Sequence, residues 1–311
     1  LYDLKTWREV DISIDERLCT IPGGGKLFGA QPSVDGELWV CYLEKAFAAH
    51  CGGWDKIDGG RPTHAWRILT GCRDVYTISR DAPGWSCTGT KNPNTGEWEP
   101  LGNSPQDGYQ GLWPMDWPEV GGGGSMDDQL ASDELFQRMY AWDAKNFILA
   151  AATKSGSDRN NTDGIVDGHA YTILSVLTNV AGSGIDMIQV RNPQGVGEFQ
   201  CGHWIDDGAG WEQHPEIYSK LRPVKADDGI FWMAKDEFFM YFDTVFVCAM
   251  DMSEFVRPRV QEEVEEVGSE AVDTSIDLND PLVVKTGGRS ACYCTNFFSM
   301  IFGKGIWDEA N

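Results

Sequence analysis

Two short segments decide the fold: DGHAYT at residues 167–172 and RNPQG at residues 191–195. His169 follows a glycine at the start of an apolar, strand-like run, and Asn192 ends the next such run, 23 residues further on. In thiol-dependent hydrolysis an imidazole accepts and later donates a cysteine proton, while an asparagine amide fixes the tautomer of the ring. His169 and Asn192 are therefore candidates for such a base and its orienting residue. The alternative is a strand histidine that only satisfies its neighbours.

Further apolar runs around these segments predict a sheet. Strand-like runs occupy residues 147–153, 169–177, 186–191, 229–233 and 244–250. Short strands in direct succession favour antiparallel pairing. A helix with Ser132 or Asp133 as its N-cap is predicted just before them, at residues 133–145.

The first third of the chain has a different pattern. Residues 1–20 predict two strands, and residues 37–50 have helical apolar spacing that ends at Gly52 and Gly53. Residues 81–125 contain six prolines and four tryptophans, which predicts a long loop or inserted segment. The many acidic residues after Arg257 predict a linker or extended tail.

Composition narrows the classes of partner. The chain has 25 Lys and Arg against 48 Asp and Glu, so its formal charge is -23. Such a surface repels phosphate backbones and anionic lipid, which argues against nucleic acid as a partner. It also fits a protein whose charge only keeps it soluble. No apolar run approaches the roughly 18 to 20 residues of a membrane span.

The nine cysteines are scattered and odd in number, which predicts reduced thiols in a cytosolic setting. Cys292 and Cys294 are one residue apart, too close for the usual two-cysteine zinc knuckle.

The motifs together resemble the protease core of the calpain family. In its second half the family has Gly-His-Ala-Tyr-Ser, Arg-Asn-Pro-Trp-Gly, Trp-Ser-Asp and Asp-Gly-Glu-Phe-Trp-Met in this order. The chain has similar motifs at residues 168–172, 191–195, 204–206 and 228–233, with Trp211 between the last two. In its first half, ELWVCYLEKAF at residues 37–47 is similar to the family's Trp-x-x-Leu-Leu-Glu-Lys-Ala-Tyr helix. The segments at 57–60 and 69–71 are similar to the loops that follow it. The resemblance covers about residues 1–78 and 132–252.

The resemblance implies an α+β fold, the papain-like calpain protease core, with a helical first subdomain and an antiparallel-sheet second subdomain. Residues 1–78 would be the C-terminal portion of the first subdomain, and 132–252 the second, which carries the histidine and asparagine. Residues 79–131 would form a Gly/Pro/Trp-rich insert, and 253–311 an acidic linker and tail. We expect Nδ1 of His169 to lie within about 2.6 to 3.2 Å of the Asn192 side-chain oxygen.

The implied activity is calcium-dependent cysteine endopeptidase cleavage of cytoplasmic proteins. The family's nucleophile motif, Gln-Gly-x-x-Gly-Asp-Cys-Trp, is not found among the 311 residues. Residues 110–113 echo it without a cysteine. We expect the cysteine and the side-chain donor of the oxyanion hole to come from sequence upstream of Leu1. The thiols judged unsuited to this role are Cys19, Cys41, Cys51, Cys72 and Cys87.

Calcium is the cofactor that the resemblance implies. By residue-by-residue comparison, the second half would use Glu198, Asp206, the backbone of Ala226, and Asp228. Ile230 replaces the next acidic ligand, which weakens such a site because calcium affinity follows the number of charged oxygens. In the first half, Asp55 would be a ligand of a separate site. The alternative for all these acids is a solvated face of an acidic protein.

Two departures from the family leave a second function open. Gln194 replaces a tryptophan beside the asparagine and is expected to shield the His169–Asn192 hydrogen bond less well from water. Together with Ile230 and the missing nucleophile, this favours a catalytically inactive scaffold or binding module in a cytoskeletal or ciliary assembly. The intact His169 and Asn192 favour the protease.

Overall fold

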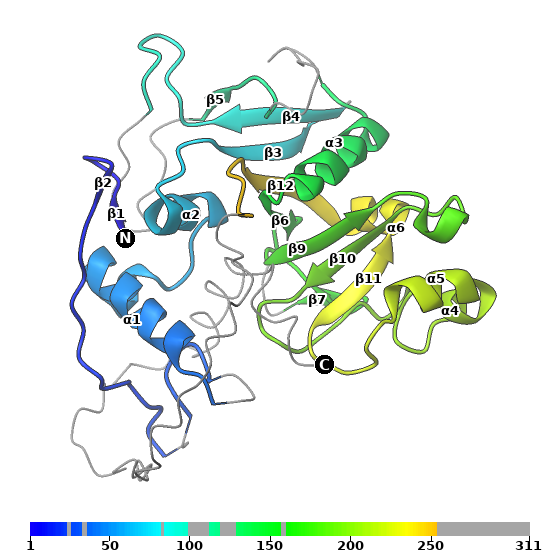
Figure 1. The fold of residues 1–311 in the computed structure, drawn as a ribbon, viewed down its shortest axis with the longest axis horizontal. Helices are drawn as coiled ribbons and strands as arrows, with labels where there is room; N and C mark the ends of the chain where they lie inside the picture. Colours follow the sequence, from blue (N-terminus) through cyan, green and yellow to red (C-terminus); the bar gives the residue numbers. More distant parts are fainter. Residues whose placement is uncertain are drawn as a thin grey trace, which may run out of the picture.

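An eight-stranded antiparallel sheet forms the centre of the molecule (Figure 1). The computed structural model describes residues 1–23, 26–32, 36–81, 84–98, 112–118, 129–156 and 160–253. The strands follow the order β11-β10-β9-β6-β12-β3-β4-β5. Their bounds are β3 Val75–Asp81, β4 Gly84–Gly89, β5 Trp113–Pro114, β6 Ile148–Thr153, β9 Ala170–Leu177, β10 Met187–Arg191, β11 Ile230–Ala234 and β12 Phe242–Cys248.

Six α-helices surround this sheet within the described residues. They are α1 Trp39–Cys51, α2 Pro62–Thr70, α3 Ser132–Ala144, α4 Ala209–Gln213, α5 Pro215–Leu221 and α6 Lys235–Tyr241. Short 3₁₀ turns occupy Trp54–Lys56 (η1) and Val180–Gly182 (η2). Two small hairpins complete the fold, β1 Tyr2–Asp3 with β2 Arg8–Glu9, and β7 Asn161–Thr162 with β8 Ile165–Val166.

The middle of the sheet is buried on both faces. In β12, Val245 and Val247 point into one hydrophobic cluster, while Phe246 and Cys248 point into another. Successive side chains of a strand alternate between faces, so a strand covered on both sides becomes apolar at every position. β6 follows the same rule, with Ala150 on the second face. Helices must therefore cover both faces of these strands.

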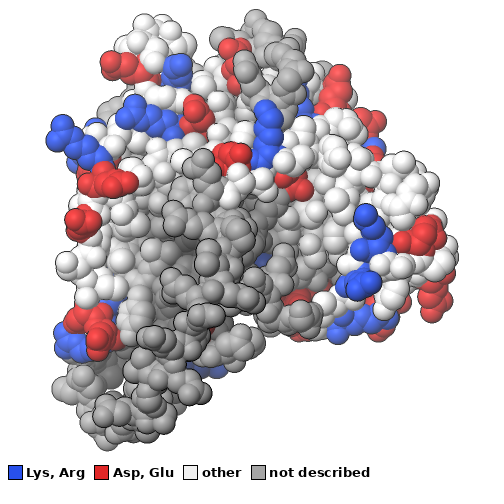
Figure 2. All heavy atoms as spheres, viewed as in Figure 1, with Lys and Arg blue, Asp and Glu red and all other residues white. Residues whose placement is uncertain are grey.

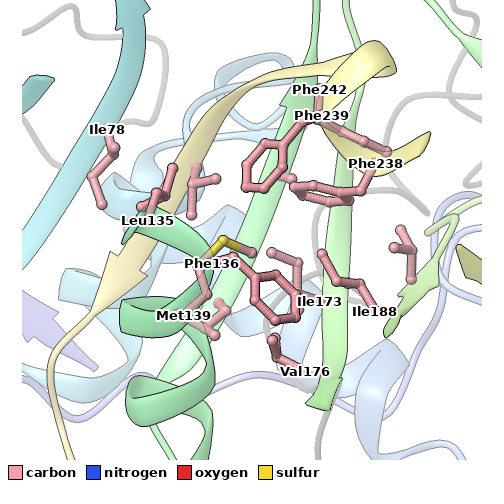
Figure 3. Packing of buried hydrophobic residues seen from close by; sticks show 14 of the residues in the cluster. Ile78, Leu135, Phe136, Met139, Ile173, Val176, Ile188, Phe238, Phe239 and Phe242 are labelled. Carbon is pink, nitrogen blue, oxygen red and sulfur yellow. The ribbon is translucent and has the colours of Figure 1, made fainter. Parts of the chain in front are cut away.

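The larger cluster lies between the sheet and helices α3 and α6 (Figure 3). Leu135, Phe136 and Met139 of α3 lie beside Ile173 and Val176 of β9 (Figure 3). From the other end of the cluster, Phe238 of α6 stacks on Phe242 with ring centroids 4.6 Å apart. Each of these aromatic or aliphatic side chains contributes roughly 1.5 to 3 kcal/mol by leaving water.

The second cluster joins α1, α2 and the N-terminal residues to the opposite face of the sheet. Phe47 of α1 and Trp66 of α2 are fully buried in it together with Leu4. Helix α1 ends at Gly52, whose φ of 96° is the left-handed conformation that glycine adopts without strain. Figure 1 shows both helices on the side of the sheet away from α4 and α5.

The structure confirms the predicted fold class and the five strands that surround the two motifs. Helices α1 and α3 also form, but the cap of α3 differs: Ala131 is the N-cap, and its amide donates to Glu134 Oε2 at 2.9 Å. Ser132 instead accepts a hydrogen bond from the Trp85 indole at 3.1 Å.

The predictions for the first 20 residues and for the loop at 81–125 were partly wrong. Residues 10–19 form no strand, because the pairing is confined to β1 and β2. Part of the expected loop joins the sheet instead: Trp85 and Cys87 of β4 point inward into the large cluster. The sheet thus has strands on both sides of residue 131, and the predicted domain boundaries stay predictions. The acidic tail lies outside the described residues.

Two further facts about the described part of the chain concern its surface charge and the apolar character of its helices. On the face shown in Figure 2, acidic and basic side chains lie interspersed between uncharged ones and form no single-sign patch. None of the described helices combines the length and the apolar character that crossing a membrane requires.

One carboxyl group is buried inside the first part of the molecule. Glu44 of α1 is 1% exposed. Its Oε2 accepts a hydrogen bond from the Ala30 amide at 2.6 Å, while its Oε1 is buried without a partner. Burial raises the pKa of Glu44 to about 8, although the Ala30 amide acts in the opposite direction. Glu44 is therefore protonated in the folded protein at neutral pH.

We predict that Glu44 makes the fold less stable as the pH rises. The folded protein holds this proton up to about pH 8, whereas an unfolded glutamate releases it near pH 4.5. Between these values the unfolded state binds fewer protons, so the free energy of unfolding falls with rising pH. Between pH 5 and 8 the wild type should lose on the order of 3 kcal/mol more than the Glu44→Gln variant. Urea unfolding followed by circular dichroism measures this, and parallel pH profiles would contradict it.

Candidate active site

The topology of the sheet brings the two candidate residues together. Strand β9 begins just after His169, and β10 ends just before Asn192. The strands are antiparallel neighbours, with Arg191 opposite Thr172, so the start of one lies beside the end of the other. β11 begins at the same edge, where Ile230 is opposite Arg191.

The backbone of His169 is fixed by Thr153 at the end of β6. The His169 amide donates to Thr153 Oγ1 at 3.0 Å, and the Thr153 amide donates to the His169 carbonyl at 3.0 Å. The preceding Gly168 has a φ of 58°, and a Cβ there would lie 2.8 Å from the Gly156 carbonyl oxygen. Glycine at 168 therefore lets the chain pass close to Gly156 before it enters β9.

The Asn192 side chain is held by four hydrogen bonds. Its Nδ2 donates to the carbonyls of Val196 at 2.8 Å and Gly197 at 3.1 Å. Its Oδ1 accepts from the Gln194 amide at 3.1 Å and lies 3.2 Å from Nε2 of His169. Because two carbonyls face the nitrogen, the orientation of this amide follows from its partners.

This orientation assigns the tautomer of His169. Asn192 Oδ1 can only accept, so Nε2 of a neutral imidazole must carry the proton and Nδ1 is the acceptor. The predicted contact within hydrogen-bond reach is present, but the predicted atom was wrong: Nε2, not Nδ1, faces the asparagine. The arrangement directs the basic nitrogen away from Asn192.

The pair is buried even though residue 194 is glutamine. Asn192 is 0% exposed and His169 is 9% exposed. The Tyr171 ring packs edge-on against the imidazole, with centroids 5.2 Å apart. Burial strengthens the hydrogen bond by excluding competing water. Whether a tryptophan at position 194 would shield the hydrogen bond better stays a prediction.

Two loops at this edge fix each other through carboxylates. Asp227 Oδ1 accepts from the Gly197 amide at 2.9 Å, and Glu198 Oε1 accepts from the amides of Asp228 and Gly229, each at 3.0 Å. Gly229 closes the link, because its carbonyl accepts from the Asn192 amide at 2.7 Å. Asp227 and Thr153 were not predicted from the sequence. The acidic pair before Gly229 was the available signal for Asp227.

The three acids predicted as metal ligands in the second half lie close enough to affect one another. Burial and then Asp206 raise the pKa of Glu198 to about 7, and Asp228 adds to this. Burial and then Asp228 raise the pKa of Asp206, while the Ala226 amide opposes this as a hydrogen-bond donor. The predicted set of Glu198, Asp206, Ala226 and Asp228 therefore forms one acidic cluster.

Calcium binding by this cluster stays a prediction. Within the described residues, no three His, Cys, Asp or Glu side chains converge so that they could hold a metal ion. Backbone amides occupy one oxygen each of Glu198 and Asp228. The oxygen donors suit calcium in type, but their arrangement falls short of its six to eight ligands.

Asp55 lies in a different part of the molecule. It is on η1, its side chain is exposed, and it pairs with Lys56 at 3.2 Å. Asp55 thus lies apart from the acidic cluster, as predicted. Its role as a metal ligand stays a prediction.

Comparison with known proteins decides the family. The model of the calpain family of cysteine proteases matches residues 1–249. The chain belongs to this family. Calpain-type cysteine protease ADL1 of Oryza sativa subsp. japonica is 29% identical over 242 residues, 77% of this chain and 9% of that protein. Calpain-5 of Mus musculus is 24% identical over 267 residues, 80% of this chain and 35% of that protein.

Calpain-9 of Rattus norvegicus is similarly related, at 26% identity over 253 residues, 80% of this chain and 30% of that protein. The chain thus spans between 9% and 35% of the length of these calpains.

Several thiols of this calpain-family chain lie in contacts that do not suit a nucleophile. Cys41 donates to the Ala30 carbonyl at 3.3 Å, and burial raises its pKa. Burial raises the pKa of Cys87 to about 12. Cys248 is fully buried, and its hydrogen bond with Cys72 raises its pKa. A nucleophile needs an accessible thiolate, which these surroundings disfavour.

We predict that NMR will find His169 in the Nε2–H tautomer when neutral. Long-range ¹H–¹⁵N spectra distinguish the protonated ring nitrogen from the other one. The Asn192→Ala variant should lose this preference, because its acceptor is removed. His214 is the internal control, since its Nδ1 lies 3.1 Å from Glu216 and the variant should leave it unchanged. A neutral His169 protonated at Nδ1 would contradict the assignment.

Proposed function

We propose that this chain carries the general base and the orienting residue of a calpain-type cysteine endopeptidase. His169 is the base and acid, Asn192 is the orienter, and the nucleophilic cysteine comes from sequence upstream of Leu1. Substrates are proteins in extended conformation. The observation that carries the proposal is the Asn192 side chain, whose four hydrogen bonds leave one orientation and one tautomer of His169.

The chemistry follows from that tautomer. Nδ1 of His169 takes the proton of the cysteine thiol, and the thiolate attacks the carbonyl carbon of the peptide bond. The imidazolium is stabilised through its Nε2–H bond to Asn192 and gives its proton to the leaving amine. Water then attacks the thioester, with His169 again accepting a proton, which releases the acid and restores the thiol.

We propose calcium as a weakly bound cation of the acidic cluster. Glu198, Asp206 and Asp228 supply hard oxygen donors, and a cation would relieve the repulsion that raises the pKa of Glu198. Low affinity for calcium is supported by two observations. Within the described residues the three acidic side chains do not converge on one point, and residue 230 is the apolar isoleucine. Calcium would neutralise charge beside Gly229, whose carbonyl holds the Asn192 amide.

The second candidate is a catalytically inactive calpain-like scaffold or binding module in the cytoplasm, in a cytoskeletal or ciliary assembly. The apolar Ile230 supports it, since a scaffold has no need to retain an acidic ligand at that position. The two candidates differ in one measurable property: a scaffold has no His169-dependent thiol reactivity.

We predict that the protein with its upstream sequence cleaves fluorogenic peptides. His169→Ala should lower kcat/KM by about 10³-fold or more, because the thiol loses its base. Asn192→Ala should lower it by about 10- to 100-fold, since backbone contacts still hold the ring. His214→Ala is the matched control, because this partly exposed histidine lies away from the pair, where its Nδ1 contacts Glu216 and its ring lies 5.8 Å from the Trp204 ring.

The 311-residue chain alone should cleave no peptide at any calcium concentration. Cleavage by this chain that His169→Ala abolishes would show that one of its own cysteines is the nucleophile. Failure of the longer protein to cleave or to react with iodoacetamide in a His169-dependent manner would favour the scaffold.

We predict that Ile230→Glu increases calcium affinity by about tenfold or more, because it adds a carboxylate at the edge of the acidic cluster. Isothermal titration calorimetry of the chain and the variant measures this. Ile230→Gln is the control for side-chain size without charge and should give a smaller increase. Equal affinities of all three proteins would show that calcium does not bind at this cluster.

A further inference from the structure

A cleft lies apart from the His169–Asn192 pair, between β3, β4, the start of α3 and helix α6. Its volume of about 420 Å³ is within the range of small-ligand and peptide sites. The residues that line it are Arg80, Gly84, Trp85, Ser132, Asp236, Phe239 and Met240. None of them takes part in the contacts that orient His169.

The floor of this cleft is apolar and firmly held. Trp85 is 1% exposed and packs on Phe239 with ring centroids 5.5 Å apart. The Trp85 indole donates to Ser132 Oγ at 3.1 Å, and the Arg80 guanidinium lies over the indole ring at 4.7 Å. Arg80 also donates to the Phe239 carbonyl at 2.6 Å. A floor fixed in this way loses little entropy when it binds a ligand.

The rim carries an apolar side chain in contact with water. Met240 is 65% exposed, although its neighbour Phe239 is buried. Methionine is flexible and polarizable, and it adapts to apolar side chains of different shapes. An exposed methionine beside a buried aromatic floor provides a surface that an apolar side chain could cover.

Two opposite charges line the cleft without pairing to each other. Arg80 uses one hydrogen bond for the Phe239 carbonyl, and its guanidinium has five donors in total. The exposed side chain of Asp236 forms no hydrogen bond or ion pair with any residue that the structure describes. A donor group and an acceptor group therefore both face the same apolar floor.

We propose that this cleft binds a peptide segment in which an apolar residue precedes a basic one. The apolar side chain packs on the exposed Met240 at the rim, its carbonyl accepts from Arg80, and the basic side chain pairs with Asp236. Such a dipeptide offers a backbone carbonyl as acceptor, one apolar side chain, and one basic side chain as donor. The formal charge of -23 also favours a basic partner over an acidic one. The site does not depend on catalysis by His169.

The test is an NMR titration of the 311-residue chain with N-acetyl-Leu-Arg-amide. The Trp85 indole N–H, identified by its loss in Trp85→Phe, reports binding at the floor. We expect a saturable shift with a Kd of about 1 mM. Asp236→Asn should weaken binding about three- to fivefold, and N-acetyl-Leu-Glu-amide should bind at least about fivefold more weakly.

Two further variants keep the result interpretable. Glu212→Gln removes one exposed acidic charge on α4, away from the cleft, and should leave the Kd unchanged. Met240→Ser changes an exposed residue, so it should fold normally, and it should weaken binding about threefold. The proposal is overturned if the indole does not shift below about 20 mM peptide. It is also overturned if both peptides bind equally, or if Asp236→Asn and Glu212→Gln bind alike.

Discussion

The fold depends on strand β12 having no solvent-facing side. From Val245 to Cys248 its side chains alternate between two hydrophobic clusters, one under α3 and α6 and one under α1 and α2. A slip of one residue in its pairing with β3 or β6 would exchange the two sets. The register is therefore strongly specified, and with it the position of β9 and β10, which continue the sheet beyond β6.

The candidate site is a consequence of this order of strands. Antiparallel pairing places the start of β9, the end of β10 and the start of β11 at one edge. The loops that leave this edge are joined by Asp227, Glu198 and Gly229, so the asparagine is supported from the neighbouring turn as well as from its own loop. The candidate pair His169 and Asn192, the acidic cluster and the sheet edge are thus one connected structure.

The sequence was sufficient where its patterns were simple. The strands around His169 and Asn192 are apolar runs of the right length, and the structure has all five. Helix α2 was not predicted, although Pro62 at its first position and Gly71 after its end are ordinary signals of a helix start and stop. It has nine residues, and its polar residues Thr63, His64 and Arg67 are buried along with the apolar ones. Strand β4 was not predicted because it has a glycine at each end and lies in a proline-rich segment, although Trp85 and Cys87 alternate with Ser86 and Thr88. The ring nitrogen that faces Asn192 depends on side-chain placement, which motif spacing does not encode.

The loop around Asn192 requires a side-chain amide at this position, whether or not a histidine lies beside it. Its Nδ2 faces the carbonyl oxygens of Val196 and Gly197. An aspartate there would set a carboxylate oxygen against two carbonyl oxygens, so lone pairs would oppose lone pairs in a site without water. The loop would thus retain asparagine even in a relative that had stopped cutting peptides. The presence of asparagine at this position therefore indicates an intact loop, and it is not by itself a sign of catalysis.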